Sequence, residues 1–257
     1  MRLVAGGCSC TAHSWPTWAH YLSLHYDDYV NTGHGGADNQ TIARNVIDTA
    51  QAGDVVVVQW TGFDRFNTFK DDSSKDFRYY KKLNAQLLMV EQCGMDRKRP
   101  TGRWVYSGSI APNREFLKQF YHPVERFRNT LDAVRSVVMH SQLVGYKLYN
   151  FTMTNWFLGE TETTVDPRLV KMHEREQFPH FYLDSNCLKV RDESGYTDPI
   201  VYDRATGWVD KHPQPYPQWL WLKDHIAPEL GLEIDTSIEQ QVKLDQQKLL
   251  DGGKFNE

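Results

Sequence analysis

Three short segments of the sequence carry side chains whose types and spacing suit acyl transfer. The first spans residues 6–11 (GGCSCT) and places Ser9 directly after an expected strand at Arg2–Ala5. Backbone N–H groups between a strand end and a helix start can bind an oxyanion, and small glycines let a substrate approach. Because Gly-x-Ser is a short pattern, a simple turn with a capping hydroxyl is the alternative interpretation.

The second segment spans residues 33–39 (GHGGADN), between an expected strand at Tyr29–Asn31 and a helix. Its backbone amides, including that of Gly36, are candidate anion donors. The segment lacks the GxGxxG spacing and the later acidic residue of a dinucleotide site, which excludes that function. In the alternative interpretation its glycines only permit positive φ, and Asp38 or Asn39 only caps the helix.

The third segment spans residues 210–213 (DKHP), just before the last helix of the domain. A histidine that acts as a general base needs a carboxylate to fix its tautomer and to support its positive charge. Asp210, two residues before His212, can supply that carboxylate. An exposed turn with incidental charges is the alternative.

Taken together, these segments resemble the motif blocks of the SGNH hydrolase superfamily, also called GDSL esterases and lipases. The resemblance covers residues 1–65 and 200–230, and its form is similar to small members carried by bacteriophages. It implies a three-layer α/β/α fold with a central, mostly parallel sheet of flavodoxin-like topology. It also implies a Ser-His-Asp triad of Ser9, His212 and Asp210, with the Ser9 and Gly36 amides as oxyanion donors and no metal or organic cofactor.

The sequence departs from the family pattern in the first, third and last blocks, and in the last block Asp210 stands two rather than three residues before His212. Cys8 stands where the family usually has aspartate. The third block reads QWTGFD over residues 59–64, which puts Phe63 where the family has the asparagine that donates to the oxyanion. The third donor is therefore expected to be either missing, at a cost of about 10²- to 10³-fold in rate, or replaced by Thr61 or Gln59.

Several further residues are candidate pocket residues. His34 and Asn39 are expected to contact substrate, and Trp60 and Trp156, at presumed strand ends, to form sugar-stacking walls, although tryptophan fills cores as readily. Arg65, just beyond the third strand, holds an anionic group or else forms a surface ion pair. No feature marks the Cys8 or Cys10 thiol as a nucleophile of lowered pKa.

No metal or cofactor site is expected. Four histidines lie close together in the sequence, but their spacing matches no standard motif such as HExxH. The four cysteines form no paired CxxC units, which excludes a zinc ribbon and a disulfide framework. The histidines are His13, His20, His25 and His34.

Composition narrows the class of protein. The 257 residues carry 29 Lys and Arg against 33 Asp and Glu, a net charge of −4 that argues against a general nucleic-acid binder. No apolar run approaches the ~20 residues that span a bilayer, so no membrane partner is expected. The first residues are too short and too glycine-rich for a signal peptide. We expect a cytoplasmic protein, or a virion protein if a phage encodes it.

The order of elements supports an α/β architecture. Residues 54–60 (DVVVVQW) form an unbroken β-branched run, typical of a strand buried on both faces of a parallel sheet. Strands and helices alternate before and after this run. We expect one domain over residues 1–232 with a helical insertion around 66–145. A helical tail over residues 233–257 is expected to be an appended docking segment for a protein partner.

Two functions from different classes follow. The first is a serine esterase that hydrolyses an ester, with O-acetyl or other acyl groups on a glycan as the substrate class suggested by family analogy. The second is a binding or structural protein that uses the same fold without turnover, such as a phage virion component. A nucleotide-using transferase is disfavoured because the sequence has no P-loop or dinucleotide fingerprint.

Overall fold

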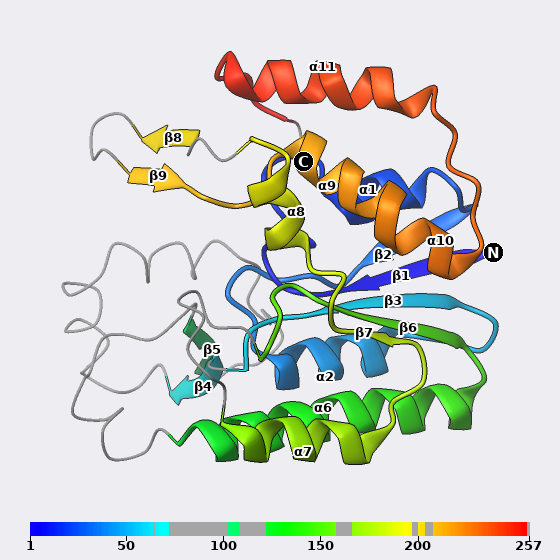
Figure 1. Ribbon diagram of the computed structural model, residues 1–257, viewed down its shortest axis with the longest axis vertical. Helices are drawn as coiled ribbons and strands as arrows, with labels where there is room; N and C mark the ends of the chain where they lie inside the picture. Colours follow the sequence, from blue (N-terminus) through cyan, green and yellow to red (C-terminus); the bar gives the residue numbers. More distant parts are fainter. Residues whose placement is uncertain are drawn as a thin grey trace.

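A five-stranded parallel sheet forms the centre of the protein, with its strands in the order β2-β1-β3-β6-β7 (Figure 1). The computed structural model describes residues 1–63, 65–71, 102–107, 122–157, 166–196, 200–203 and 208–255. The sheet strands are β1 (Arg2–Gly6), β2 (Asp28–Asn31), β3 (Val55–Trp60), β6 (Lys147–Thr152) and β7 (Phe181–Tyr182). Numbered within the sheet, this is the 2-1-3-4-5 order of flavodoxin-like folds, as the sequence predicts.

The β-branched run lies in the middle of this sheet. Strand β3 pairs in parallel with β1 on one side and with β6 on the other. All of its residues are buried, because helices cover both faces. The strand begins after Asp54, whose carboxylate accepts hydrogen bonds from the Arg2 guanidinium and from the backbone N–H of Gln51.

Helices cover both faces and complete the three layers (Figure 1). One face carries α2 (Asn39–Thr49) and α6 (Pro123–Val144), with α7 (Pro167–Glu176) packed on α6. The other carries α1 (Trp18–Ser23), α8 (Cys187–Glu193), α9 (Pro215–Trp221) and α10 (Ala227–Leu230). Large aromatic side chains fill the core between these layers: Trp18, Trp60, Phe127, Phe151, Trp219 and Trp221 are fully buried.

Several predicted elements have different bounds in the structure. The sequence predicts a long helical region over residues 113–143 with a break at Pro123, and α6 begins at Pro123, a residue suited to the first turn of a helix. A helix predicted over residues 219–226 begins earlier, at Pro215, and continues through a π-helical turn (Leu222–Ile226) to Leu230. A further helix predicted over residues 77–93 lies outside the described residues.

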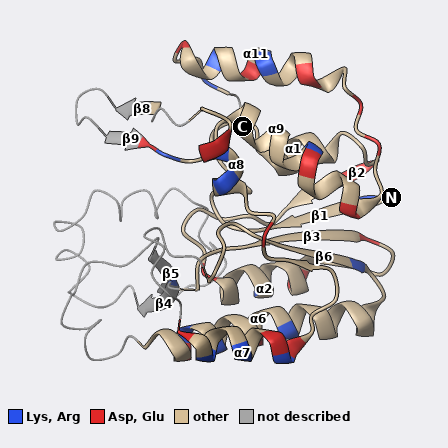
Figure 2. Cartoon of the chain, viewed as in Figure 1, with Lys and Arg blue, Asp and Glu red and all other residues tan. Residues whose placement is uncertain are grey.

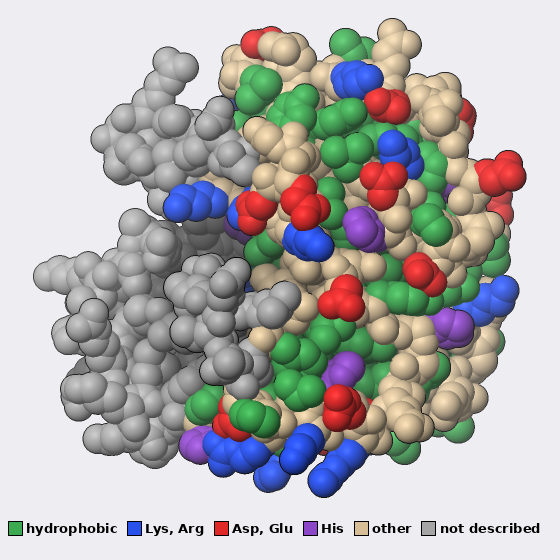
Figure 3. Space-filling view, in the orientation of Figure 1, with side chains coloured by type: hydrophobic (Ala, Val, Ile, Leu, Met, Phe, Trp, Pro, Cys, Tyr) green, Lys and Arg blue, Asp and Glu red, His purple; other side chains and the backbone are tan. Residues whose placement is uncertain are grey.

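Two short antiparallel pairs lie outside the main sheet. One joins β4 (Phe66–Asp71) to β5 (Gly102–Ser107), and the other joins β8 (Ile200–Asp203) to β9 (Trp208–Asp210). Charged residues concentrate on the outer helices, and the sheet carries few of them (Figure 2). The face shown in Figure 3 mixes both signs of charge with hydrophobic side chains. No helix in the described ranges is long and apolar enough to cross a membrane.

The C-terminal tail is helical and packs on the body of the protein. Its helix α11 (Ile238–Leu250) lies against α9 and buries Val242 and Leu249 there. The Gln246 side chain accepts a hydrogen bond from the backbone N–H of Tyr216. The apolar face of the tail is thus already covered by this chain, and docking of a protein partner through the tail stays a prediction.

Candidate active site

Three side chains predicted to act together meet beyond the carboxyl end of the central sheet. The Ser9 Oγ lies 2.6 Å from His212 Nε2, although 203 residues separate the two along the chain. On the other side of the ring, His212 Nδ1 lies 2.5 Å from Asp210 Oδ1. Ser9 follows β1, Asp210 ends β9, and His212 lies in the loop before α9. The order hydroxyl, imidazole, carboxylate is that of a proton relay.

A tight turn holds Ser9 in place. The backbone N–H groups of Thr11 and Ala12 both donate to the carbonyl of Cys8, so the chain turns sharply at the serine. The Thr11 hydroxyl donates to the Gln59 side chain at the end of β3. Gly7 is needed because a Cβ there would lie 1.9 Å from Thr11 Oγ1 and 3.2 Å from the Gln59 carbonyl oxygen.

Gly7→Ala is therefore expected to destabilise the protein by about 1–3 kcal/mol, the usual cost of overpacking a tight site. The added methyl group has to displace Thr11, and with it the turn that carries Ser9. Urea unfolding of the purified variant measures the change. If Gly7→Ala had the same free energy of unfolding as wild type, the turn would accommodate the added methyl group, and the prediction would be wrong.

Asp210 is buried, and its Oδ1 accepts two hydrogen bonds from the same residue, His212. The exposed fraction of Asp210 is 2%. Oδ1 accepts from the His212 ring and from the His212 backbone N–H at 2.8 Å. Burial alone would raise the pKa of Asp210, but hydrogen bonds and charge from His13 and His212 outweigh it and hold that pKa well below its usual range. The carboxylate therefore stays ionised at neutral pH.

A second histidine, His13, contacts the other oxygen of Asp210. Its Nε2 lies 3.1 Å from Oδ2, and its side chain is only 8% exposed. Its Nδ1 lies 3.2 Å from the Ser14 hydroxyl. With that hydroxyl as donor, a neutral His13 carries its proton on Nε2, the ring atom nearest Oδ2, without forming a hydrogen bond to it. Asp210 is thus held between two imidazoles.

Aromatic packing fixes the position of His13. Its ring centroid lies 3.9 Å from that of Trp15 and 4.6 Å from that of His212. Trp15 in turn donates from Nε1 to the Pro213 carbonyl, which ties the two loops together. In the sequence, His13 is only one of four histidines that lie close together. Its position four residues after Ser9 was the available signal, but the contact with Asp210 depends on the fold.

Burial lowers the pKa of His13, which predicts a measurable pH effect on stability. Below the unfolded pKa of about 6.5, the unfolded chain binds a proton at this ring that the folded chain does not. The free energy of unfolding should therefore fall as pH drops from about 6.5 towards the lowered folded value. The low pKa of Asp210 acts in a separate window, below about 3.9.

His13→Gln is expected to make the free energy of unfolding depend less steeply on pH below about 6.5. Part of the slope should remain, because burial also lowers the pKa of His173, on α7. His173→Gln is the matched control and should remove only its own share. Urea titrations between pH 5 and pH 8 measure both. An unchanged slope in His13→Gln would contradict a neutral buried ring.

The predicted oxyanion loops lie side by side. The backbone N–H of His34 donates to the Gly7 carbonyl at 3.0 Å, which joins the second loop to the first. Gly36 has φ +74°, a left-handed conformation that glycine adopts without strain. Within the described residues, the N–H groups of Ser9 and Gly36 make no backbone hydrogen bond, so both remain available to a ligand.

The prediction that Thr61 or Gln59 replaces the missing oxyanion donor is corrected by the structure. Both side chains are fully buried. Gln59 donates to Cys187 Sγ and accepts from Thr11, while the nearest partner of the Thr61 hydroxyl is Met153 sulfur. These groups hold the core together and cannot reach a substrate without unfolding it.

Two further pocket predictions are also corrected. Trp60 has no exposed surface and donates from Nε1 to Asn150, so it cannot stack on a sugar. Trp156 is buried as well and donates to the Thr61 carbonyl. The Asn39 side chain accepts from the Thr61 N–H and donates to the Thr61 carbonyl, so it anchors the end of β3. His34 is half-buried in the second loop.

Neither cysteine beside Ser9 is a candidate nucleophile. Cys8 and Cys10 are both buried. Hydrogen bonds from neighbouring cysteines and burial raise the pKa of both thiols well above the usual value. Because the thiolate is the reactive form, both side chains are inert at neutral pH. Ser9 is the group that the site presents to a ligand.

Comparisons with known proteins add little to this geometry. No family model matches the sequence, and no curated protein does. Among solved structures, the chain is similar to the crystal structure of the protein YxiM from Bacillus subtilis, with 13% sequence identity and a TM-score of 0.34. The similarity covers 73% of this chain and 44% of that one, so the chain spans less than half the length of this neighbour.

Proposed function

We propose that this protein is a serine ester hydrolase of the SGNH type, in which Ser9 is the nucleophile. His212 accepts the Ser9 hydroxyl proton as the oxygen attacks the ester carbonyl. The Ser9 and Gly36 amides stabilise the oxyanion of the tetrahedral intermediate. His212 then returns the proton to the departing alcohol, which leaves an acyl group on Ser9.

Hydrolysis of the acyl group repeats the same proton transfers with water as the nucleophile. His212 removes a proton from water, the hydroxide attacks the acyl carbon, and the proton passes to Ser9 as the acid leaves. Asp210 keeps the His212 proton on Nδ1 and supports the positive ring in both halves. His13 acts as a positioning residue, since its Nε2 lies 3.1 Å from the free oxygen of that carboxylate.

One observation carries the proposal: the continuous chain of contacts from Ser9 Oγ through both nitrogens of His212 to a buried carboxylate. His212 remains 29% exposed, so a substrate can reach the ring from solvent. An ester fits better than an amide for a first assay, because an alcohol or phenol leaves more readily. Acyl groups on a glycan remain the substrate class expected from the family resemblance.

Covalent labelling tests the nucleophile directly. A fluorophosphonate probe is expected to label the wild-type protein in a 1:1 ratio and to leave Ser9→Ala unlabelled. Ser23→Ala is the matched control, because Ser23 is bonded to its own helix and lies outside the site. Peptide mapping should place the adduct on Ser9. Equal labelling of wild type and Ser9→Ala would overturn the proposal and favour a non-catalytic binding protein.

A metal test distinguishes this mechanism from metal-assisted hydrolysis. The ligand atoms of His13, Asp210 and His212 lie within 4.8 Å of one another, which also suits a divalent cation. In the proposed mechanism His212 transfers the protons and Asp210 and His13 only position it, so treatment with EDTA is expected to leave p-nitrophenyl acetate hydrolysis unchanged. Added Zn²⁺ should inhibit, because it competes for the His212 ring. Loss of activity with EDTA and recovery with metal would contradict the triad.

A further inference from the structure

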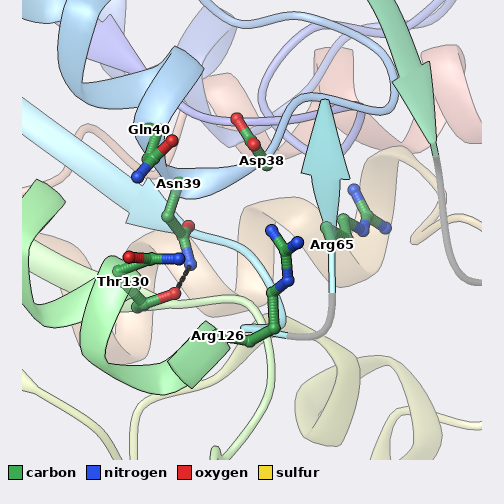
Figure 4. Close-up of a pocket in the computed structure, with 7 residues that line it drawn as sticks. Asp38, Asn39, Gln40, Arg65, Arg126 and Thr130 are labelled. Carbon is green, nitrogen blue, oxygen red and sulfur yellow. Dashed lines mark hydrogen bonds between the residues drawn. The ribbon is translucent and has the colours of Figure 1, made fainter. Parts of the chain in front are cut away.

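A small polar cavity lies beside the loop that follows β3. It has a volume of about 10 Å³, enough for one water-sized group such as a single carboxylate oxygen, and is lined from three parts of the chain: the start of α2, the loop at Arg65, and the first turns of α6 (Figure 4). Its charged residues are Asp38, Arg65 and Arg126. The uncharged polar residues Asn39, Gln40, Asn129 and Thr130 complete the lining. None of these groups belongs to the proposed triad.

Of the two arginines in the lining, Arg65 is the one left with an unpartnered group. Asp38 and Arg126 already have partners, whereas one guanidinium nitrogen of Arg65 has none. Oδ1 of Asp38 already accepts a hydrogen bond from the backbone N–H of Thr41, as the N-cap of α2. The amino end of this 11-residue helix adds a partial positive charge at the same place.

Arg65 supplies the observation that points to a ligand. Its Nη1 is buried and has no hydrogen-bond partner. A buried guanidinium N–H without an acceptor is costly, and arginine is the residue most suited to bind carboxylate or phosphate oxygens. An oxyanion with one oxygen in the cavity would supply the missing acceptor.

The cavity lies at the same edge of the sheet as Ser9. The loops that carry Ser9, Asp38 and Arg65 follow β1, β2 and β3, whose carboxyl ends are adjacent because these strands are parallel and paired. The charge of Arg65 also acts on the turn around Ser9. Hydrogen bonding and burial raise the pKa of Cys8 and Cys10, and the positive charge of Arg65 opposes that rise at both.

We infer that this cavity binds an oxyanion group, a carboxylate or a phosphate, carried by the ester substrate, with Arg65 as its main ligand. The inference rests on the proposed ester hydrolysis and assigns to it a preference for anionic substrates. Bound in this way, the anionic group holds the substrate beside Ser9 and lowers KM. Neutral esters lack this contact and depend on the triad and oxyanion donors alone.

Matched esters test the preference. Mono-p-nitrophenyl glutarate and p-nitrophenyl valerate have acyl chains of similar length and differ in the terminal carboxylate. The wild-type ratio of kcat/KM, glutarate over valerate, is expected to be roughly tenfold or more, as for a charge-assisted hydrogen bond. In Arg65→Gln this ratio should fall towards one, mainly through KM of the glutarate ester. Arg65→Lys should keep part of it.

The control and the contradicting results are equally specific. Arg128→Gln removes an exposed arginine on α6 that pairs with Glu125, and it should keep the wild-type ratio. A purely structural role for Arg65 would change the rates of both esters together and leave their ratio unchanged. A wild-type ratio near one, or an undiminished ratio in Arg65→Gln, would overturn the inference.

Anion binding without turnover separates this inference from the proposed function. Inorganic phosphate and acetate are titrated into wild type and Arg65→Gln by calorimetry at fixed ionic strength, and the stronger of the two identifies the preferred oxyanion. Binding to wild type that is lost in Arg65→Gln supports the site even if no ester is hydrolysed. Hydrolysis that depends on Ser9, with no anion binding and no ester preference, supports the proposed function and overturns the anion site.

Discussion

His212→Ala is expected to lower kcat for p-nitrophenyl acetate on the order of 10⁴- to 10⁶-fold. The ring accepts the serine proton from 2.6 Å, and no other described group touches Ser9 Oγ. Without it, the hydroxyl would have to attack as a neutral and weakly nucleophilic group. The residual rate should resemble that of Ser9→Ala, because residues that act as one unit are far from additive.

The measurement is steady-state hydrolysis of p-nitrophenyl acetate with freshly purified protein. His20→Ala is the matched control, because His20 is an exposed histidine on α1 that has no part in the proposed triad. Thermal melting of each variant shows whether it is folded. Turnover of His212→Ala within tenfold of wild type would mean that another group removes the proton, and the relay would have to be abandoned.

Asp210→Asn is the second large effect, with an expected loss in kcat of about 10⁴-fold. The carboxylate accepts from the His212 ring and backbone through Oδ1, and its Oδ2 faces His13 Nε2 at 3.1 Å. An asparagine has only one acceptor oxygen, so its amide group must face one of the two imidazoles. His212 then loses support for its positive form, or takes the tautomer with Nε2 protonated, which cannot accept from Ser9.

The pH profile checks this explanation. Because the pKa of Asp210 is held well below its usual range, wild-type activity is expected to show no loss from protonation of this carboxylate down to pH 5. In Asp210→Asn, raising the pH should not restore kcat, since the amide does not ionise. Asp192→Asn, at an exposed position on α8, is the control. Recovery of Asp210→Asn at high pH would point to a different role for the carboxylate.

His13 distinguishes this site from a triad with a single histidine. Its Nε2 lies 3.1 Å from Oδ2, and this proximity helps to hold the pKa of the buried carboxylate below its usual range, although the hydrogen bonds to Asp210 are both on Oδ1. This arrangement couples the sequence immediately after Ser9 to the loop that carries His212. The Asp210 carboxylate therefore contacts both the segment that follows Ser9 and the loop that carries His212.

Local patterns in the sequence were enough to predict the central sheet. The valine run over residues 55–58 can only be buried on both faces, and the structure places it in the middle strand. The three polar segments each follow a strand or precede a helix, so their meeting at one sheet edge was predictable from parallel topology. The assignment of Ser9, His212 and Asp210 as one triad came from the family resemblance, because Asp210 ends β9, which lies outside the parallel sheet.

Burial of individual side chains was not predictable in the same way. Thr61, Gln59 and Trp60 stand at the end of a strand, where the sequence suggests contact with substrate. Their side chains point instead into the layers between sheet and helices, where each finds a partner far along the chain. Which face of a strand end meets solvent depends on what packs over it, and those residues are distant in sequence.

The amino-acid sequence alone determined the order of strands and helices and the chemical types that gather at the carboxyl edge of the sheet, because both follow from short-range periodicity and from residue type. Only the tertiary structure decided that His13 contacts Asp210 and that Arg65 faces a polar cavity with an unpaired N–H. Contacts of this kind join segments separated by tens to hundreds of residues, and packing selects them.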